Sequence, residues 1–183
     1  MLAVFSWEFT AMVDIKKYIR DFPDFPKPGI LFKDISPILK SPEAMGHIED
    51  RFYEHYKHHD IDLIGGAESR GFIFAATLAR RMNKGLVMIR KKGKLPGPTK
   101  GLAYGIEYGN AEMELQHDAV KKGEKVLLID DLLATGGTAS AAAKLIESFG
   151  GEVVGHAFVV ELTFLEGRKT LGDSKILTLV QYD

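Results

Sequence analysis

The stretch VLLIDDLLATGGTA, residues 126–139, determines the predicted fold and locates the predicted chemistry. Its first four residues are apolar, as is typical of a central strand in a parallel sheet, and they carry Asp130 and Asp131 to the carboxyl end of that strand. Open α/β sheets bind their ligands at this end. Residues 134–138 then form a turn rich in glycine and hydroxyl groups before a helix. Free N–H groups and the helix dipole at such a turn favour a phosphate.

The predicted phosphate-binding residues are those of this turn: Ala134, Thr135, Gly136, Gly137 and Thr138. Glycine lets the backbone close round an anion, and the two threonine hydroxyls are further donors. An ordinary strand-to-helix turn, with Thr138 as the N-cap, is the alternative interpretation. The lysine of a Walker loop is missing, which disfavours an NTPase. A sugar phosphate whose hydroxyls face Asp130 and Asp131 fits the pattern better.

The composition excludes several classes of protein. The chain has 183 residues, of which 45% are hydrophobic and 27% charged, as in a soluble globular protein of about one domain. A formal net charge of −1 excludes binding to nucleic acid or membranes by bulk electrostatics. Cysteine is absent, so disulfides and thiolate metal sites are excluded, and we expect a cytoplasmic location. No apolar run approaches the roughly 18 residues that a membrane-spanning helix needs.

The order of predicted elements indicates an α/β domain with a parallel central sheet. Predicted strands alternate with predicted helices, the strands at 61–65, 86–89, 126–129, 153–162 and 176–180 and the helices at 71–82 and 138–149. The weakly alternating residues between Pro98 and Gln116 predict a projecting hairpin. Residues 1–11 are apolar and lack a basic n-region, so we expect a flexible extension ahead of one domain, 12–183, and no secretory signal.

The amino-terminal third of the chain predicts two helices and an intervening loop. The helices are expected at 14–20 and from Pro42 to about His58, the second with Ser41 as its N-cap. Three prolines within residues 23–28 predict an ordered loop over 21–29, whose phenylalanines we expect to be buried.

Two further segments carry groups that suit a diphosphate. The sequence GGAESRG, residues 65–71, follows a predicted strand and opens a helix, and its Arg70 is able to bind a diphosphate with two parallel hydrogen bonds. The sequence RKKGK, residues 90–94, places four cations within five residues. An ordinary glycine-rich connection and a solvated charged face remain the alternatives for these two segments.

Together these segments resemble the type I phosphoribosyltransferases. The resemblance runs from Asp14 to the C-terminus and is carried, in order, by residues 22–37, 68–72, 90–99, 107–109, 126–139 and 181–182. It implies a parallel sheet flanked by helices, a small hood at about 21–40 and a mobile flap at about 93–117. It also implies a cytoplasmic, homodimeric pentosyltransferase of purine salvage. This Mg²⁺-dependent enzyme would convert adenine and 5-phosphoribosyl 1-diphosphate to AMP and diphosphate.

The resemblance also implies roles for individual residues. Asp130 and Asp131 bind the ribose. The diphosphate is bound by Glu68, Ser69, Arg70, Arg90, Lys91 and Lys94. Adenine is bound by Leu31, Phe32 and Lys33, and Tyr108 belongs to the flap. Glu107 and Arg70 are the catalytic candidates. Glu107 would handle the proton on the base, because Ala134 stands where related oxopurine enzymes have an aspartate. We expect substrate oxygens and water, rather than protein side chains, to hold most of the Mg²⁺.

Some features leave alternatives open. The nearest alternative function is an enzyme of the same kind whose acceptor is another purine or a pyrimidine. A more distant alternative is a ligand-sensing regulator that has no catalytic activity. The latter needs a DNA-binding domain, for which the chain has no spare length. Phe72, Phe74, Leu78 and Leu95 are predicted to line a two-fold subunit interface, with ordinary core packing as the alternative.

Overall fold

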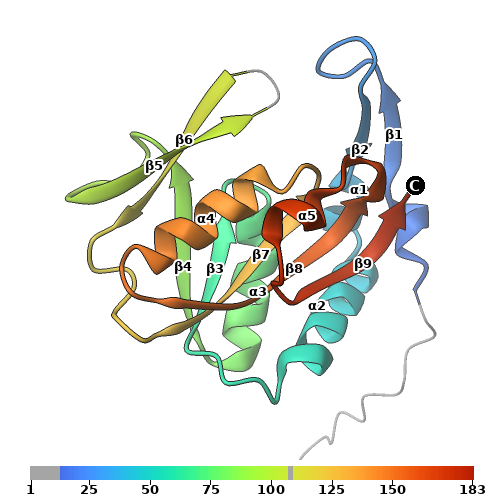
Figure 1. Ribbon diagram of the computed structural model, residues 1–183. Helices are drawn as coiled ribbons and strands as arrows, with labels where there is room; N and C mark the ends of the chain where they lie inside the picture. Colours follow the sequence, from blue (N-terminus) through green and yellow to red (C-terminus); the bar gives the residue numbers. More distant parts are fainter. Residues whose placement is uncertain (1–12, 107–108) are drawn as a thin grey trace, which may run out of the picture. The chain divides into compact units, whose positions relative to one another are not determined.

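The computed structural model describes residues 13–106 and 109–183 (Figure 1). The chain divides into two compact units, Met1–Asp50 and Arg51–Asp183. The predicted extension at 1–11 lies outside the described residues, as do Glu107 and Tyr108. The division into an extension, one domain, a hood and a flap stays a prediction. None of the described helices is long and apolar enough to cross a membrane.

The first unit contains a two-stranded antiparallel ribbon. A 3-10 helix, η1 Ile15–Tyr18, leads into β1 Arg20–Pro23, which pairs with β2 Leu31–Asp34. The short helix α1 Ser36–Lys40 follows, and α2 Pro42–Tyr56 begins in this unit. The predicted N-cap of α2 is confirmed, because the Ser41 hydroxyl oxygen accepts a hydrogen bond of 3.2 Å from the Ala44 N–H.

Two predictions for this unit are wrong. The expected helix at 14–20 is a single 3-10 turn, because Arg20 enters β1 and its guanidinium pairs with the Asp34 carboxylate across the ribbon. The expected loop at 21–29 begins as a strand and does not bury its phenylalanines. Phe22 is 46% and Phe25 53% exposed, and Phe25 packs edge-to-face on Phe32 with 5.1 Å between ring centroids. The ribbon therefore presents aromatic surface.

The second unit is built on a seven-stranded sheet of order β5-β6-β4-β3-β7-β8-β9. Its strands are β3 Leu63–Ala67, β4 Gly85–Lys91, β5 Thr99–Ile106, β6 Gly109–Gln116, β7 Lys125–Leu133, β8 Glu152–Leu162 and β9 Ile176–Tyr182. The five neighbouring strands β4, β3, β7, β8 and β9 run parallel to one another. Strands β5 and β6 form an antiparallel hairpin, joined to β4 through β6. The predicted parallel sheet and the predicted hairpin are both confirmed.

Helices cover both faces of this sheet (Figure 1). Helix α3 Gly71–Met82 lies behind it, while α4 Gly137–Glu147 and the short α5 Gly167–Leu171 lie in front. One core cluster fills the space between α4 and the sheet, and Ile89, Met113 and Leu145 in it are almost wholly buried. Burial of such side chains stabilises the fold by about 1.5–3 kcal/mol each. The parallel register brings the turns after β3, β7 and β8 to one edge.

The predicted subunit patch is wrong for two of its four residues, while Phe72 and Leu95 are partly buried. Phe74 is 1% exposed and Leu78 is fully buried, so both belong to the core beneath α3. The helical period of 3.6 residues places them on the face of α3 that packs on the sheet. The large apolar side chains that this region exposes are different ones: Ile73 at 39%, Leu86 at 40% and Met88 at 43%.

Candidate active site

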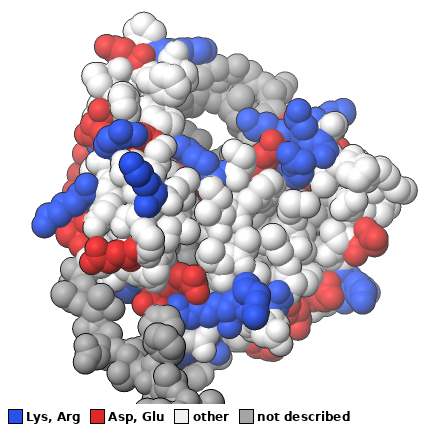
Figure 2. All heavy atoms as spheres, turned by 180° about the vertical axis from the view of Figure 1, so that it is seen from behind, with Lys and Arg blue, Asp and Glu red and all other residues white. Residues whose placement is uncertain are grey.

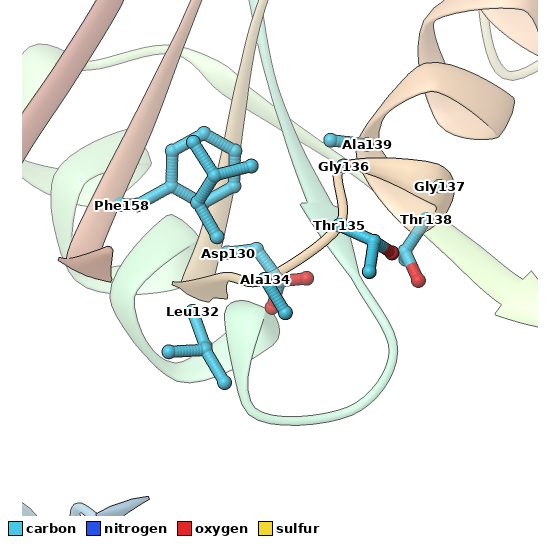
Figure 3. Close-up of a pocket in the computed structure, with 10 residues that line it drawn as sticks. Asp130, Leu132, Ala134, Thr135, Gly136, Gly137, Thr138, Ala139 and Phe158 are labelled. Atoms are coloured by element: carbon cyan, nitrogen blue, oxygen red, sulfur yellow. The ribbon is translucent and has the colours of Figure 1, made fainter. Parts of the chain in front are cut away.

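The predicted phosphate turn lines a pocket at the carboxyl end of β7 (Figure 3). Its cavity volume is about 70 Å³, and it is lined by Asp130, Leu132, Leu133, Ala134, Thr135, Gly136, Gly137, Thr138, Ala139 and Phe158. Figure 3 shows the backbone of residues 134–136 curving round this space before α4 begins. All five predicted phosphate residues and one of the two predicted ribose residues therefore face one cavity.

The turn ends at the amino terminus of α4 without a side-chain cap. Gly136 is the N-cap, with φ 81° and ψ −4°, and no side chain of the described chain bonds to the first N–H groups there. Thr138 is thus not the N-cap, while the phosphate-binding role of the turn stays a prediction. A left-handed φ is the conformation in which glycine is favoured. The uncapped N–H groups are the donors that an anion at this position needs.

The two predicted ribose carboxylates lie side by side at the end of β7. Asp130 Oδ1 accepts a hydrogen bond of 2.9 Å from the Asp131 N–H. Asp131 is almost fully buried, and its Oδ2 lies 2.9 Å from Nε of Arg70. Burial, followed by the charge of Asp131, raises the pKa of Asp130 well above its usual value. Burial also raises the pKa of Asp131, against the opposing charge of Arg70.

The amino terminus of α3 packs directly on these carboxylates. A Cβ atom on Gly71 would lie 2.8 Å from both Asp130 Oδ1 and the Ile129 carbonyl oxygen. Such a separation is too short for any side chain, so glycine is required at this contact. The loop before α3 therefore packs against the end of β7, and Arg70 lies against the Asp131 carboxylate.

Four of the six predicted diphosphate residues belong to one hydrogen-bond network. Glu68 Oε2 accepts from the Lys91 N–H at 2.9 Å and lies 3.3 Å from Arg90 Nε, and Arg90 Nη1 donates to the Lys94 carbonyl at 3.0 Å. Burial works to raise the pKa of Glu68, but these bonds hold it below its usual value. The Glu68–Ser69 peptide bond is cis. The network joins the loop after β3 to the cationic segment after β4.

Glu114 of β6 is a site-shaping residue that the sequence analysis missed. Its Oε1 accepts hydrogen bonds of 2.8 Å from both the Lys94 and the Leu95 N–H, and Oε2 lies 3.2 Å from the Thr99 hydroxyl. The bond from Leu95, ahead of the others, lowers the pKa of Glu114. The signal was present: the glutamate stands between two apolar residues in Met113-Glu114-Leu115, and all three are buried. A buried carboxylate requires such partners.

The roles of the adenine-binding and flap residues stay predictions. Leu31, Phe32 and Lys33 lie on β2 in the first unit, and their adenine-binding role stays a prediction. The Lys33 ammonium lies 2.8 and 2.9 Å from the two carboxylate oxygens of Asp21. Glu107 and Tyr108 are outside the described residues. In the described part of the chain, no group of three or more His, Asp or Glu residues is arranged to hold a metal ion.

Comparisons with known proteins agree with this geometry. The chain matches the family model of the phosphoribosyl transferase domain over residues 34–178. The adenine phosphoribosyltransferase of Nitrosopumilus maritimus is 53% identical over 170 residues, which cover 93% of this chain and 100% of that relative. The crystal structure of the adenine phosphoribosyltransferase from Thermoanaerobacter pseudethanolicus superposes with a TM-score of 0.89 at 48% identity, covering 92% of this chain and 98% of that one.

A more distant solved structure has ligands in it. The adenine phosphoribosyltransferase of Trypanosoma brucei, in complex with AMP, pyrophosphate and ribose-5-phosphate, has a TM-score of 0.85 and 30% identity, covering 91% of this chain and 77% of that one. These likenesses confirm the predicted type I phosphoribosyltransferase fold. The chain therefore belongs to the phosphoribosyltransferase family and, within it, to the adenine phosphoribosyltransferases.

Proposed function

We propose that this protein binds 5-phosphoribosyl 1-diphosphate along the carboxyl edge of its sheet and transfers the phosphoribosyl group to adenine there. By family it is a pentosyltransferase of purine salvage, which forms AMP and diphosphate from these two substrates. The observation that carries the proposed site is the pocket that residues 134–138 share with Asp130. The Trypanosoma brucei relative, solved in complex with AMP, pyrophosphate and ribose-5-phosphate, supports the proposed class of ligand.

The proposed roles follow from the charges of the reacting groups. The N–H groups of residues 134–138 bind the 5′-phosphate, and the carboxylates of Asp130 and Asp131 accept hydrogen bonds from the ribose hydroxyls. When the bond between the sugar carbon and the diphosphate breaks, positive charge develops on the sugar and negative charge on the diphosphate. The guanidinium of Arg70 and the cationic segment at 90–94 stabilise that negative charge.

Magnesium belongs to the same proposal. When bound, Mg²⁺ supplies further neutralisation of the diphosphate. This ion prefers oxygen ligands and keeps several waters, so the diphosphate oxygens and water are its proposed main ligands. The Asp130 carboxylate, which lines the pocket, would accept a hydrogen bond from a water bound to the ion.

Recognition of the base is assigned to the first unit and to the hairpin. The backbone of residues 31–33 is proposed to read the edge of adenine, because an N–H and a carbonyl match its N1 acceptor and 6-amino donor. A 6-oxo purine reverses that polarity and is disfavoured. Glu107 is proposed to handle the proton on the base, since Ala134, which lines the pocket, has no titratable group.

The activity is tested by a panel of bases. The protein, Mg²⁺ and 5-phosphoribosyl 1-diphosphate are mixed with adenine, hypoxanthine, guanine, xanthine or orotate, and nucleotide and diphosphate formation are measured. We expect AMP from adenine, with a kcat/KM at least about a hundredfold above that for any other base. A preference for another base contradicts the adenine assignment. If the protein binds 5-phosphoribosyl 1-diphosphate but converts none of the bases, the alternative of a ligand-sensing regulator without catalysis is favoured.

The second proposed property is a homodimer in the cytoplasm. The patch proposed for the interface consists of Ile73, Leu86 and Met88, whose large apolar side chains are exposed on α3 and β4. Exposed apolar patches mark protein–protein contacts. On the face seen from behind in Figure 2, which α3 covers, Lys and Arg gather in separate groups, and a broad area between them carries no charge. The absence of cysteine fits a reducing compartment.

Light scattering at micromolar concentration is expected to give twice the chain mass of 20.3 kDa. Met88→Asp is expected to shift the protein to the monomer, because it buries an unpaired charge in the interface. Phe164→Asp, at another exposed apolar residue, is the matched control and is expected to leave the dimer intact. A wild-type protein that is monomeric and fully active excludes the dimer, and a dimeric Met88→Asp variant excludes this patch.

A further inference from the structure

The short helix α5 lies against the outside of the phosphate turn. The Thr170 hydroxyl donates a hydrogen bond of 2.7 Å to the Thr135 carbonyl. A Cβ atom on Gly167 would lie 2.2 Å from the Ala134 carbonyl oxygen, and one on Gly136 would lie 2.5 Å from the Gly167 carbonyl oxygen. Helix α5 thus contacts three consecutive residues of the turn, Ala134 and Gly136 through its backbone and Thr135 through the Thr170 side chain. No motif had pointed to α5, which is more than thirty residues away along the chain.

Helix α5 is itself fixed to the sheet by an ion pair. The Arg168 guanidinium donates Nε–H to Glu161 Oε1 at 2.7 Å and Nη2–H to Oε2 at 2.8 Å. Thr178 and Gln181 of β9 each donate to Oε2 at 2.9 Å. The Glu161 side chain is almost fully buried at the end of β8, and the bond from Arg168, ahead of the others, lowers its pKa to about 2. Such a bidentate pair has a defined geometry.

We infer that α5 is a brace for the phosphate turn and that Thr170 is a positioning residue for the 5′-phosphate of the substrate. This inference rests on the proposed function of the turn. Thr170 touches no substrate atom in this scheme. Its hydroxyl holds the Thr135 carbonyl on the outside of the turn, so that the N–H groups of the following residues stay directed into the pocket. Gly167 is required because any side chain there would occupy the position of the Ala134 carbonyl.

The brace has a specific kinetic consequence. A turn that is free to rotate its peptide groups presents fewer donors to the phosphate, so ligands that carry the phosphate bind less tightly. The 5′-phosphate takes no part in bond breaking and is held equally before and during the reaction. Weaker binding of this phosphate therefore raises the KM for 5-phosphoribosyl 1-diphosphate, while kcat changes little. Adenine carries no phosphate, and its KM is expected to stay unchanged.

The experiment compares Thr170→Val with Thr170→Ser. Valine keeps the shape of threonine but removes the donor, and we expect about a fivefold rise in KM for 5-phosphoribosyl 1-diphosphate. The same rise is expected in the dissociation constant of ribose 5-phosphate, measured by calorimetry. Serine keeps the hydroxyl and is expected to restore both values. Thr77→Val is the matched control, because Thr77 donates a similar bond of 3.0 Å to the Phe74 carbonyl in α3, away from the turn.

The outcomes separate the brace from the proposed function. If the wild type is active and Thr170→Val binds ribose 5-phosphate as tightly as the wild type, the brace is overturned and the proposed function stands. A wild type that makes no AMP overturns the function, and the calorimetric comparison still tests the brace. Equal effects of Thr170→Val and Thr77→Val indicate a general loss of stability and also overturn the inference. Gly167→Ala is expected to have a larger effect than Thr170→Val, with the fold checked by thermal unfolding.

Discussion

Gly136→Val is expected to weaken binding of 5-phosphoribosyl 1-diphosphate by about a hundredfold, which corresponds to about 2.7 kcal/mol. Two effects act together at this residue. A β-branched side chain is strained at φ 81°, and its Cβ would lie 2.5 Å from the Gly167 carbonyl and 2.9 Å from Thr170 Cβ. The turn must move to accommodate it, and the N–H groups that face the pocket move with it. The measurement is the dissociation constant of ribose 5-phosphate, with KM as a second readout.

Gly123→Val separates these two effects. Gly123 has a φ of 85° and no atom within 4 Å of the Cβ position, so the same substitution there introduces the backbone strain without the contact. We expect Gly123→Val to lower the stability of the protein while ligand affinity stays at the wild-type value. If Gly136→Val binds ribose 5-phosphate normally, the turn at 134–138 is not the phosphate site.

Glu107→Gln is expected to lower kcat by about a hundredfold and to leave the binding of 5-phosphoribosyl 1-diphosphate nearly unchanged. Glutamine keeps the shape of the side chain but carries no charge and does not accept a proton at neutral pH. Because Ala134 in the pocket has no titratable group, the proposed function needs a carboxylate from another segment for the proton. The measurements are steady-state kcat with adenine and ribose 5-phosphate affinity by calorimetry.

Glu112→Gln is the matched control for this substitution. Glu112 stands on the same hairpin in β6, and its carboxylate lies 2.7 Å from the Lys92 ammonium. We expect near wild-type turnover for Glu112→Gln, since its loss removes only an exposed ion pair, which contributes little. Wild-type turnover of Glu107→Gln instead means that Glu107 is an ordinary solvent-facing residue of the hairpin, and the proton on the base is then handled elsewhere.

The sequence alone predicted those features that depend on neighbouring residues. Four apolar residues ahead of Asp130 were enough to predict β7, and Gly71–Met82 was predicted with the bounds that α3 has. The turn at 134–138 was predicted because its glycines and its position before a helix are local properties. These features follow from side-chain periodicity and backbone preference within one segment, which act wherever the rest of the chain lies.

Only the tertiary structure decided which segments meet. The apolar residues of α3 did not reveal whether Phe74 or Ile73 faces the core, because that depends on how the helix is rotated on the sheet. Glu114 became part of the site only through its bonds to Lys94 and Leu95. Likewise, Thr170 meets the turn because β8 and β9 bring α5 back across it, held by Glu161 and Arg168. Contacts between distant segments arise from the packing of the whole unit, and no pattern within a single segment of the sequence encodes them.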